Sequence, residues 1–209
     1  MRSFIPACGL AAFALCAASA AAAAGDPAEV PRPGICAFSG WSADPDPAGL
    51  NVRAAPSANA PMVGRLPPPE QVEDLHFATE FDVLESRNGW FRIANARRWS
   101  EEGAQASTLP SGWISGRFLR FALQTDRAFA SPDPNSRVVA FTWRDGAGMI
   151  QPFAYRDPTD CRGEWVKLTV TGHDGRPREA WVRGVCGVQE TTCDGVEGDM
   201  LDYDDLPVR

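Results

Sequence analysis

The chain has 209 residues, of which 20 are lysine or arginine and 27 are aspartate or glutamate, so its formal net charge is −7. Proteins that bind nucleic acid need clustered cations to displace counterions, so this acidic balance excludes DNA and RNA as expected partners. The 18 prolines and 19 glycines exceed ordinary usage but fall short of a low-complexity disordered chain, which predicts a globular, loop-rich protein.

The first segment is typical of a secretory signal peptide. A cationic start at Arg2 is followed by an almost unbroken apolar run over 4–18 and by small residues through Ala24. Residues 1–24 are therefore predicted to be a signal peptide that is cleaved before Gly25. The alternative, a membrane anchor, needs about 20 apolar residues with clear charged flanks. No later segment approaches that length, so we expect no membrane span and a periplasmic or secreted protein.

Cleavage also changes the cysteine count. The mature chain keeps 209 − 24 = 185 residues and four of the six cysteines, Cys36, Cys161, Cys186 and Cys193. An even number in an exported chain favours disulfides, and four cysteines leave three connectivities open. Zinc is the alternative, but no C-x-x-C pair or nearby histidine supplies ligand spacing. We therefore expect no metal and no other cofactor.

After a proline-rich leader over 25–35, short apolar runs alternate with turn-forming residues, and no stretch keeps a helical period over three turns. The strongest local signal is Asn88-Gly89 between two strand-like runs, because a two-residue hairpin turn requires positive φ. Closely spaced short strands suit a small barrel, and the fold predicted is all-β. The first five expected strands lie at 49–53, 62–66, 81–85, 90–94 and 112–114.

The order of these signals recurs later in the chain. Arg53 to Trp90 spans 37 positions, and Arg127 to Trp165 spans 38. The spacing therefore predicts a second copy of the same unit. Its strand-like runs lie at 127–129, 137–140, 164–168 and 180–182.

The two copies differ in their last hairpin. Trp90 to Trp113 spans 23 positions, whereas Trp165 to Trp181 spans 16, and the additional seven residues of the first copy fall at 97–103. Loops carried by a rigid scaffold often hold binding specificity.

Four sequence blocks of the first copy carry a family resemblance. They are L-N-V-R-A-A-P-S at 50–57, V-G-R-L at 63–66, N-G-W-F-R-I at 88–93 and G-W-I-S-G-R-F-L at 112–119. In this order they resemble the bacterial SH3-like domain (SH3b, Src-homology-3 type), over about residues 48–121. The resemblance implies a small SH3-like β-barrel. The tryptophans expected in the core of the two copies are Trp90, Trp113, Trp165 and Trp181.

The second copy is similar to this pattern in layout rather than in motif. Asp126-Arg127 replaces Val-Arg, and no Asn-Gly precedes Trp165, but the ending with Cys186 and Cys193 resembles some secreted tandem SH3b proteins. The expected fold is therefore two small SH3-like β-barrels in tandem, stabilised by disulfides. The expected domains are 36–122 and 123–193, followed by an acidic tail over 194–209 that lacks calcium-loop spacing and is expected to be solvated.

Catalytic motifs are weak. A cysteine–histidine pair could be drawn with His173, but no room remains for a catalytic domain beside two barrels, and no G-x-S-x-G motif occurs. His173 lies in a turn, and His76 is expected to be structural. We therefore expect a protein that is not an enzyme.

Some tryptophans and arginines lie outside the strand-core pattern and are candidate binding residues. Trp41 and Trp99, with Arg97 and Arg98, could form a groove between loops for a cell-wall peptide or glycan, as the SH3b resemblance implies. These rings could equally cap the barrel ends. The function expected is a binding module for peptidoglycan or another envelope component. The alternative is an envelope protein–protein adaptor or inhibitor that uses the loop around Trp99.

Overall fold

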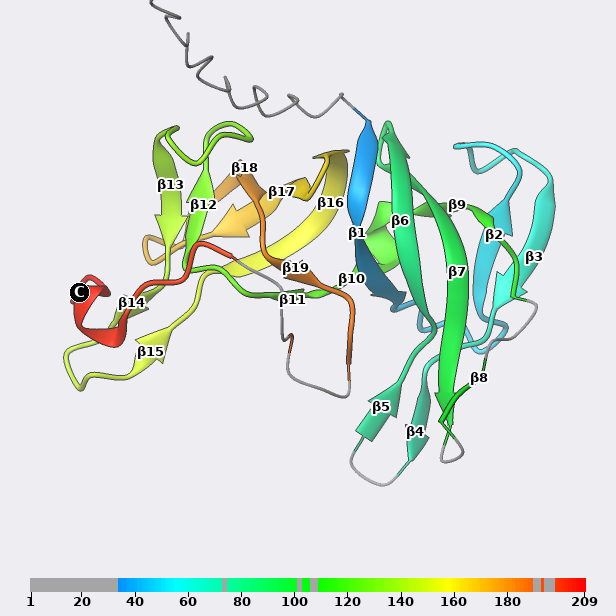
Figure 1. The fold of residues 1–209 in the computed structure, drawn as a ribbon, viewed down its shortest axis with the longest axis horizontal. Helices are drawn as coiled ribbons and strands as arrows, with labels where there is room; N and C mark the ends of the chain where they lie inside the picture. The colour runs from blue at the N-terminus through cyan, green and yellow to red at the C-terminus, as the bar shows by residue number, and fades with distance from the viewer. Residues whose placement is uncertain (1–33, 73–74, 101–102, 106–108, 190–192, 194–197) are drawn as a thin grey trace, which may run out of the picture. The chain divides into compact units, whose positions relative to one another are not determined.

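The computed structural model describes residues 34–72, 75–100, 103–105, 109–189, 193 and 198–209, all within one compact unit. The predicted signal peptide over 1–24 and most of the predicted leader lie outside the described residues. The described part is built from short β-strands, with two single-turn 3-10 helices and no α-helix (Figure 1). The all-β prediction is confirmed.

The first half forms an antiparallel sheet of eight strands with one predicted hairpin at its centre. Its strands are β1 (Ile35–Ser42), β2 (Leu50–Arg53), β3 (Met62–Leu66), β6 (Glu80–Arg87), β7 (Trp90–Ser100), β8 (Gly103–Gln105), β9 (Gly112–Ser115) and β10 (Leu119–Arg120). They lie in the order β10-β1-β6-β7-β9-β2-β3, with β8 paired to β7. Asn88 and Gly89, with φ of 51° and 77°, form the tight turn between β6 and β7. Asn-Gly favours this two-residue turn because both of its central positions require positive φ.

Shorter elements complete the first half. The strands β4 (Glu70–Val72) and β5 (Leu75–Phe77) pair with each other, and the 3-10 helix η1 (Gly116–Phe118) joins β9 to β10. In β2 the buried Leu50 and Val52 alternate with the partly exposed Asn51 and Arg53, as expected for a strand with one face on the core.

The second half forms an antiparallel sheet of five strands. These are β12 (Arg127–Phe129), β13 (Val138–Phe141), β16 (Ala154–Arg162), β17 (Trp165–Thr171) and β18 (Pro177–Val182), in the order β13-β12-β18-β17-β16. Two further pairs are β11 (Ala122–Leu123) with β19 (Val185–Cys186), and β14 (Trp143–Arg144) with β15 (Ile150–Gln151). The 3-10 helix η2 (Tyr203–Asp205) lies near the C-terminus.

The two halves repeat one strand order. The series β3-β2-β9-β7-β6 of the first sheet corresponds, strand for strand, to β13-β12-β18-β17-β16 of the second. The loops of their first hairpins also repeat: the amide of Asn59 donates to Ser57 Oγ at 3.2 Å, and that of Asn135 donates to Asp133 Oδ1 at 2.8 Å. The internal repeat inferred from spacing is therefore present in the backbone.

The register of the repeat differs slightly from the one predicted. Arg53 pairs with Trp113 across β2 and β9, and Phe129 pairs with Trp181 across β12 and β18. Arg53 therefore corresponds to Phe129, two positions beyond Arg127. The predicted register aligned Arg53 with Arg127 because both are arginines. In the sheets, a β-bulge lies immediately before Arg53 and immediately before Phe129, so these two residues are equivalent.

The two halves share one hydrophobic core. Its buried residues include Phe81 and Phe91 of the first sheet and Val166 and Leu168 of the second. Among the described residues no sheet closes into a barrel, and β10 and β3 remain at the edges of the first sheet. The prediction of two separate closed barrels is thus not confirmed.

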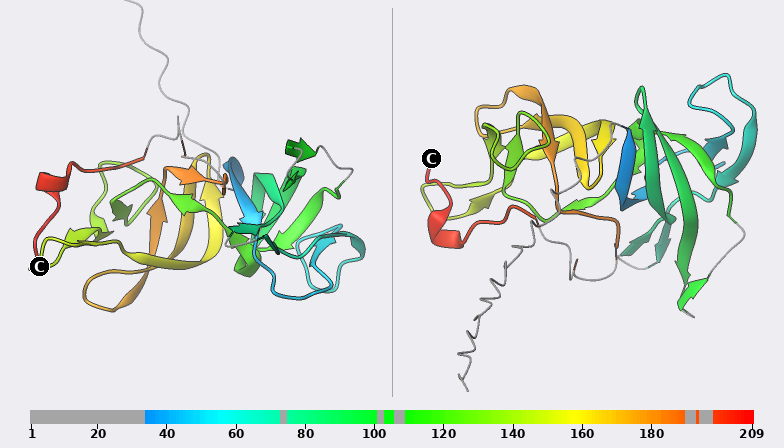
Figure 2. Two further views of the ribbon diagram at one scale, coloured as in Figure 1. Left: turned by 90° about the horizontal axis from the view of Figure 1, so that it is seen from below. Right: turned by 45° about the horizontal axis from the view of Figure 1, so that its top comes forward.

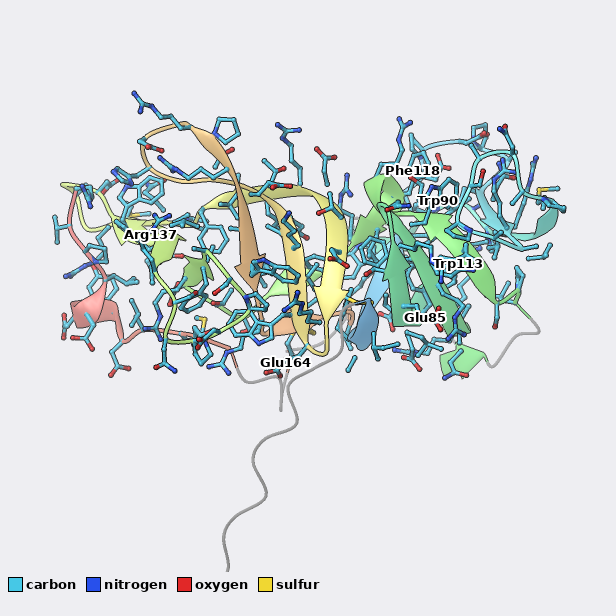
Figure 3. The ribbon with its side chains drawn as sticks, turned by 90° about the horizontal axis from the view of Figure 1, so that it is seen from above. Glu85, Trp90, Trp113, Phe118, Arg137 and Glu164 are labelled. Atoms are coloured by element: carbon cyan, nitrogen blue, oxygen red, sulfur yellow. A yellow bond between two sulfur atoms is a disulfide. The ribbon has the colours of Figure 1, made fainter. Side chains whose placement is uncertain are left out.

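The predicted core tryptophans lie at matching positions of the repeat. Trp113 is 7% exposed and Trp181 is 8% exposed, whereas Trp90, on the strand beside Trp113, is half-buried (Figure 3). The guanidinium carbon of Arg87 lies 5.9 Å from the Trp113 ring centre, and that of Arg162 lies 5.8 Å from Trp181. Each half therefore covers its central tryptophan with an arginine from the end of a hairpin.

Two disulfides use all four predicted cysteines. Cys36 is bonded to Cys161 with a Cα separation of 5.4 Å, and Cys186 is bonded to Cys193 at 5.8 Å. The first links β1 to β16 and so joins the two halves. The sequence had left three pairings open, and the structure selects this one.

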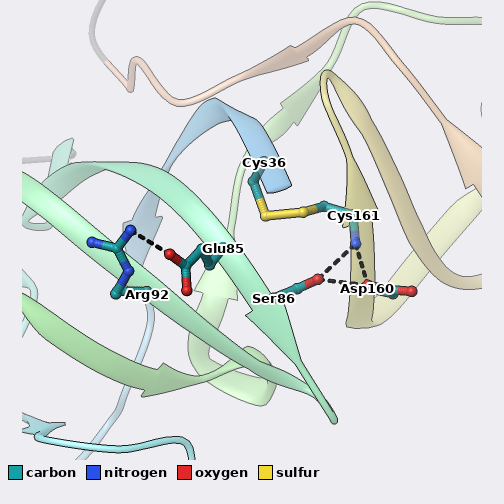
Figure 4. The surroundings of a disulfide bond; sticks show 6 residues. All are labelled: Cys36, Glu85, Ser86, Arg92, Asp160 and Cys161. Atoms are coloured by element: carbon teal, nitrogen blue, oxygen red, sulfur yellow. Dashed lines mark hydrogen bonds and ion pairs between the residues drawn. A yellow bond between two sulfur atoms is a disulfide. The ribbon is translucent and has the colours of Figure 1, made fainter. Parts of the chain in front are cut away.

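The junction around the first disulfide is also hydrogen-bonded (Figure 4). Ser86 Oγ donates to Asp160 Oδ1 at 2.5 Å, and the amide of Cys161 donates to both Ser86 Oγ and Asp160 Oδ1, at 3.1 and 2.8 Å. The backbones of Cys36 and Gly163 form an isolated parallel bridge. These hydrogen bonds, which are buried or partly buried, fix the register between the two halves.

A tyrosine anchors the connection between the halves. The ring of Tyr155 in β16 stacks on Phe121, with centres 5.0 Å apart, and the phenol donates to the carbonyl of Phe121. Burial raises the pKa of the Tyr155 phenol above its ordinary value, against the opposing effect of that hydrogen bond.

Residues 198–209 of the acidic C-terminal segment combine exposed and buried positions: Asp202, Asp204 and Asp205 are exposed, whereas two other residues are buried. Asp199 is 5% exposed and receives two hydrogen bonds from the Arg183 guanidinium, at 2.8 and 2.9 Å. Leu206 is 4% exposed, and Val208 forms a parallel bridge with Arg144 of β14. Figure 2 shows this red segment along the yellow-green strands β14 and β15. Asp199 and Leu206 thus anchor the described part of this segment, while its other carboxylates remain exposed.

Candidate functional site

Trp41 and Arg97, two of the four predicted binding residues, belong to one row across four strands. Trp41 of β1 is paired with Arg120 of β10 on one side and with Glu80 of β6 on the other, and Glu80 is paired with Arg97 of β7. Directly paired residues project their side chains to the same face of a sheet. We call Arg120, Trp41, Glu80 and Arg97 the Trp41 row. Its members are an arginine, a partly buried indole that also packs against the core, a buried carboxylate and a second arginine.

Glu80 is the fully buried residue of this row, and its carboxylate orients Arg97. It is 0% exposed, and its Oε2 lies 3.3 Å from Arg97 Nε, while its Oε1 accepts the amide of Gln189 at 2.9 Å. Arg97 also lies 3.6 Å from Asp82. A buried carboxylate is tolerated only when its charge and lone pairs are satisfied. Glu80 therefore holds the Arg97 side chain in one orientation.

A segment of the second half packs against the Trp41 row at Glu80. The amide of Gly187 donates to Ser39 Oγ at 3.2 Å, and the Gln189 side chain accepts the amide of Ala78 at 3.0 Å. A Cβ on Gly187 would lie 2.4 Å from the backbone of Gly40 and Ser39, so only glycine fits there. We call residues 187–189 the strap. The disulfide at Cys186 lies directly before it.

Arg98 and Trp99 are placed differently from Arg97. Arg98 follows Arg97 in β7, so its side chain projects to the opposite face, where it pairs with Glu70 Oε2 at 2.7 Å. The backbone of Trp99 pairs with Ala104 in β8, and its side chain lies outside the described part. The structure therefore brings Trp41 and Arg97 to one face and separates Arg98 from them.

Sequence reasoning missed Glu80, Arg120 and the strap. Glu80 precedes the expected strand by one residue and has the polar character of an outward position. Its burial depends on Gln189, which is 109 positions away in the sequence. No local pattern signals such a contact. Arg120 was predictable as a strand residue, but its alignment with Trp41 depends on the pairing of β1 with β10.

Other reactive side chains do not gather in the described residues. All four described cysteines are in disulfides, and no group of three or more histidine, cysteine, aspartate or glutamate side chains there could hold a metal ion. The exposed His173 packs against Phe141 and Trp143, with ring centres 5.5 and 5.8 Å away. The side chain of His76 lies outside the described part.

The two disulfides are consistent with an oxidising, extracytoplasmic environment. Within the described ranges, no helix has the length and apolar character needed to cross a membrane. Comparison of the chain with protein-family models, curated proteins and solved structures finds no match.

Proposed function

We propose that this chain is an exported tandem of two SH3-like modules that binds peptidoglycan or another envelope component without catalysing a reaction. The site proposed is the Trp41 row, in which Trp41 provides a stacking surface and Arg97 and Arg120 provide donors for carboxylate or carbonyl groups.

The repeated strand order supports the tandem assignment. The four SH3b-like blocks fall on β2, on β3, on the hairpin of β6 and β7, and on β9 with η1 and β10, all within one sheet and its connection. The second sheet repeats five of these strands in the same order. One module type present twice accounts for both the spacing in the sequence and the topology.

The observation that carries the binding proposal is the geometry of the Trp41 row. An indole between two arginines on one sheet face combines a flat apolar surface with planar donors, which suits a ligand with sugar rings and peptide carboxylates. The buried Glu80 fixes Arg97 before any ligand arrives, which reduces the entropy lost on binding.

Sedimentation with purified peptidoglycan sacculi tests the proposal. Native protein is expected to sediment with sacculi, and Trp41→Ala and Arg120→Ala to remain in the supernatant. Arg98→Ala is the matched control, because Arg98 lies next to Arg97 in the same strand but on the opposite face. Near-ultraviolet circular dichroism establishes that each variant is folded. Failure of the native protein to sediment, or equal sedimentation of folded Trp41→Ala, would overturn the proposal.

A further inference from the structure

A second surface lies at the far end of the second half, on β14, β15 and the C-terminal segment. It carries large apolar side chains that are mostly exposed: Met149 at 62%, Ile150 at 54%, Tyr203 at 49% and Val208 at 63%. Monomeric proteins rarely expose apolar side chains in contiguous groups, and such groups mark interaction sites. We call these four residues the apolar patch.

Hydrogen bonds and strand pairing hold the patch together. Arg144 of β14 is paired with Ile150 of β15 and bridged to Val208, so the three side chains share one face. The Arg144 guanidinium lies 4.5 Å from the Tyr203 ring centre, and the Tyr203 hydroxyl donates to the carbonyl of Gly148 at 2.7 Å. The apolar side chains are thus presented by a fixed backbone.

Carboxylates surround the patch. Asp202, Asp204 and Asp205 are exposed beside Tyr203, and Asp145 begins the turn that carries Met149. The pKa of Asp145 is lowered, first by the hydrogen bond from the amide of Met149, so this carboxylate is charged at neutral pH.

Two cations lie nearby, but both are engaged. The Arg144 guanidinium donates to the carbonyls of Leu206 and Asp204, each at 3.3 Å. The Arg209 guanidinium lies 5.1 Å from the Phe141 ring centre. Four carboxylates, those of Asp145, Asp202, Asp204 and Asp205, outnumber these two cations, so the rim of the patch is acidic overall.

We propose that the apolar patch binds a basic, apolar segment of a protein partner in an extended conformation. Charge complementarity identifies the partner as basic, because a second copy of this chain or an anionic lipid surface would bring like charges together. Among the described residues β15 pairs as a strand only with β14, and an extended peptide commonly binds by adding to such a strand edge. This surface is distinct from the Trp41 row and extends the function to a protein ligand.

The test uses the full chain and a synthetic twelve-residue peptide of alternating leucine and lysine, with binding measured by isothermal titration calorimetry. The double variant Ile150→Ser, Val208→Ser removes apolar surface, and Asp204→Asn, Asp205→Asn removes charge. We expect the dissociation constant to rise about tenfold or more in each. Val63→Ser is the matched control, because Val63 is 50% exposed in β3 of the first half, and its dissociation constant should not change.

Two further peptides separate the contributions. Replacement of leucine by serine keeps the charge, and replacement of lysine by glutamate reverses it; both peptides should bind at least tenfold more weakly. The proposal is overturned if the leucine–lysine peptide does not bind, if the serine–lysine peptide binds equally well, or if either double variant binds like the native protein. It is also overturned if sedimentation equilibrium shows that the native chain self-associates and that Ile150→Ser, Val208→Ser abolishes this. Loss of sacculus binding would leave these outcomes unaffected.

Discussion

The two disulfides should differ in what they contribute to stability, because they close loops of very different length. Cys36 and Cys161 are separated by 125 positions, and Cys186 and Cys193 by seven. A crosslink lowers the entropy of the unfolded chain by an amount that grows with the logarithm of the loop length. Applied to these separations, the relation gives about 5 kcal/mol for the first bond and about 2.4 kcal/mol for the second at 25 °C.

The perturbation is the paired replacement of each disulfide by alanine, Cys36→Ala with Cys161→Ala, and Cys186→Ala with Cys193→Ala. Urea unfolding at neutral pH, followed by tryptophan fluorescence, gives the free energy of unfolding for both variants and the native protein. We expect the variant without the long-range bond to lose about twice as much free energy as the other.

If loss of the Cys186–Cys193 bond costs as much as loss of the Cys36–Cys161 bond, or more, the long-range bond does not stabilise the protein by restricting the unfolded chain. An unfolding curve with two separate transitions in the native protein would contradict the shared core, because one core predicts that both halves unfold together.

Three further predictions concern single side chains. The pKa of the Tyr155 phenol is raised in the folded protein, so the stabilisation linked to the protonated phenol is complete below pH 10 and is lost as the pH rises further. Tyr155→Phe should therefore remove this alkaline dependence of the free energy of unfolding, measured with urea at pH 8 and pH 11. Tyr203→Phe, at an exposed tyrosine, should not remove it. Gly187→Ala should lower the free energy of unfolding by about 2 kcal/mol, because the added Cβ would meet backbone atoms of Ser39 and Gly40. Gly146 has open space around it, so Gly146→Ala should not lower the free energy of unfolding. Equal effects of the two substitutions would contradict the close approach of the strap. Asp199→Ala should lower the free energy of unfolding by about 2 kcal/mol, because the hydrogen bonds from Arg183 are lost. Replacement of the exposed Asp205 by alanine should leave the free energy of unfolding unchanged. A neutral Asp199→Ala would argue against the buried pairing of Asp199 with Arg183.

Local patterns in the sequence predicted the elements well where short-range geometry decides the structure. Asn88-Gly89 specified its hairpin because few residues adopt positive φ, and the spacing of the tryptophans revealed the repeat because each occupies a similar place in its sheet. The register was displaced at Arg127, since a β-bulge moves the equivalence from Arg127 to Phe129 without leaving a local signal.

Long-range contacts could not be predicted in the same way. The burial of Glu80 depends on Gln189, and the burial of Asp199 depends on Arg183. The candidate site was therefore predicted in part: Trp41 and Arg97 were identified as residues, but their shared face and the opposite orientation of Arg98 follow only from strand pairing.

The measurement that tests the proposed function most directly is the affinity of native protein, Trp41→Ala and Trp143→Ala for purified sacculi, from sedimentation over a range of sacculus concentrations. Trp143 is a matched control because it is another partly buried tryptophan, in the second half. Loss of an aromatic anchor typically weakens binding by about tenfold or more, so Trp41→Ala should show that loss while Trp143→Ala binds like the native protein. Equal affinities of all three proteins, or no binding by the native protein, would contradict the Trp41 row as an envelope-binding site.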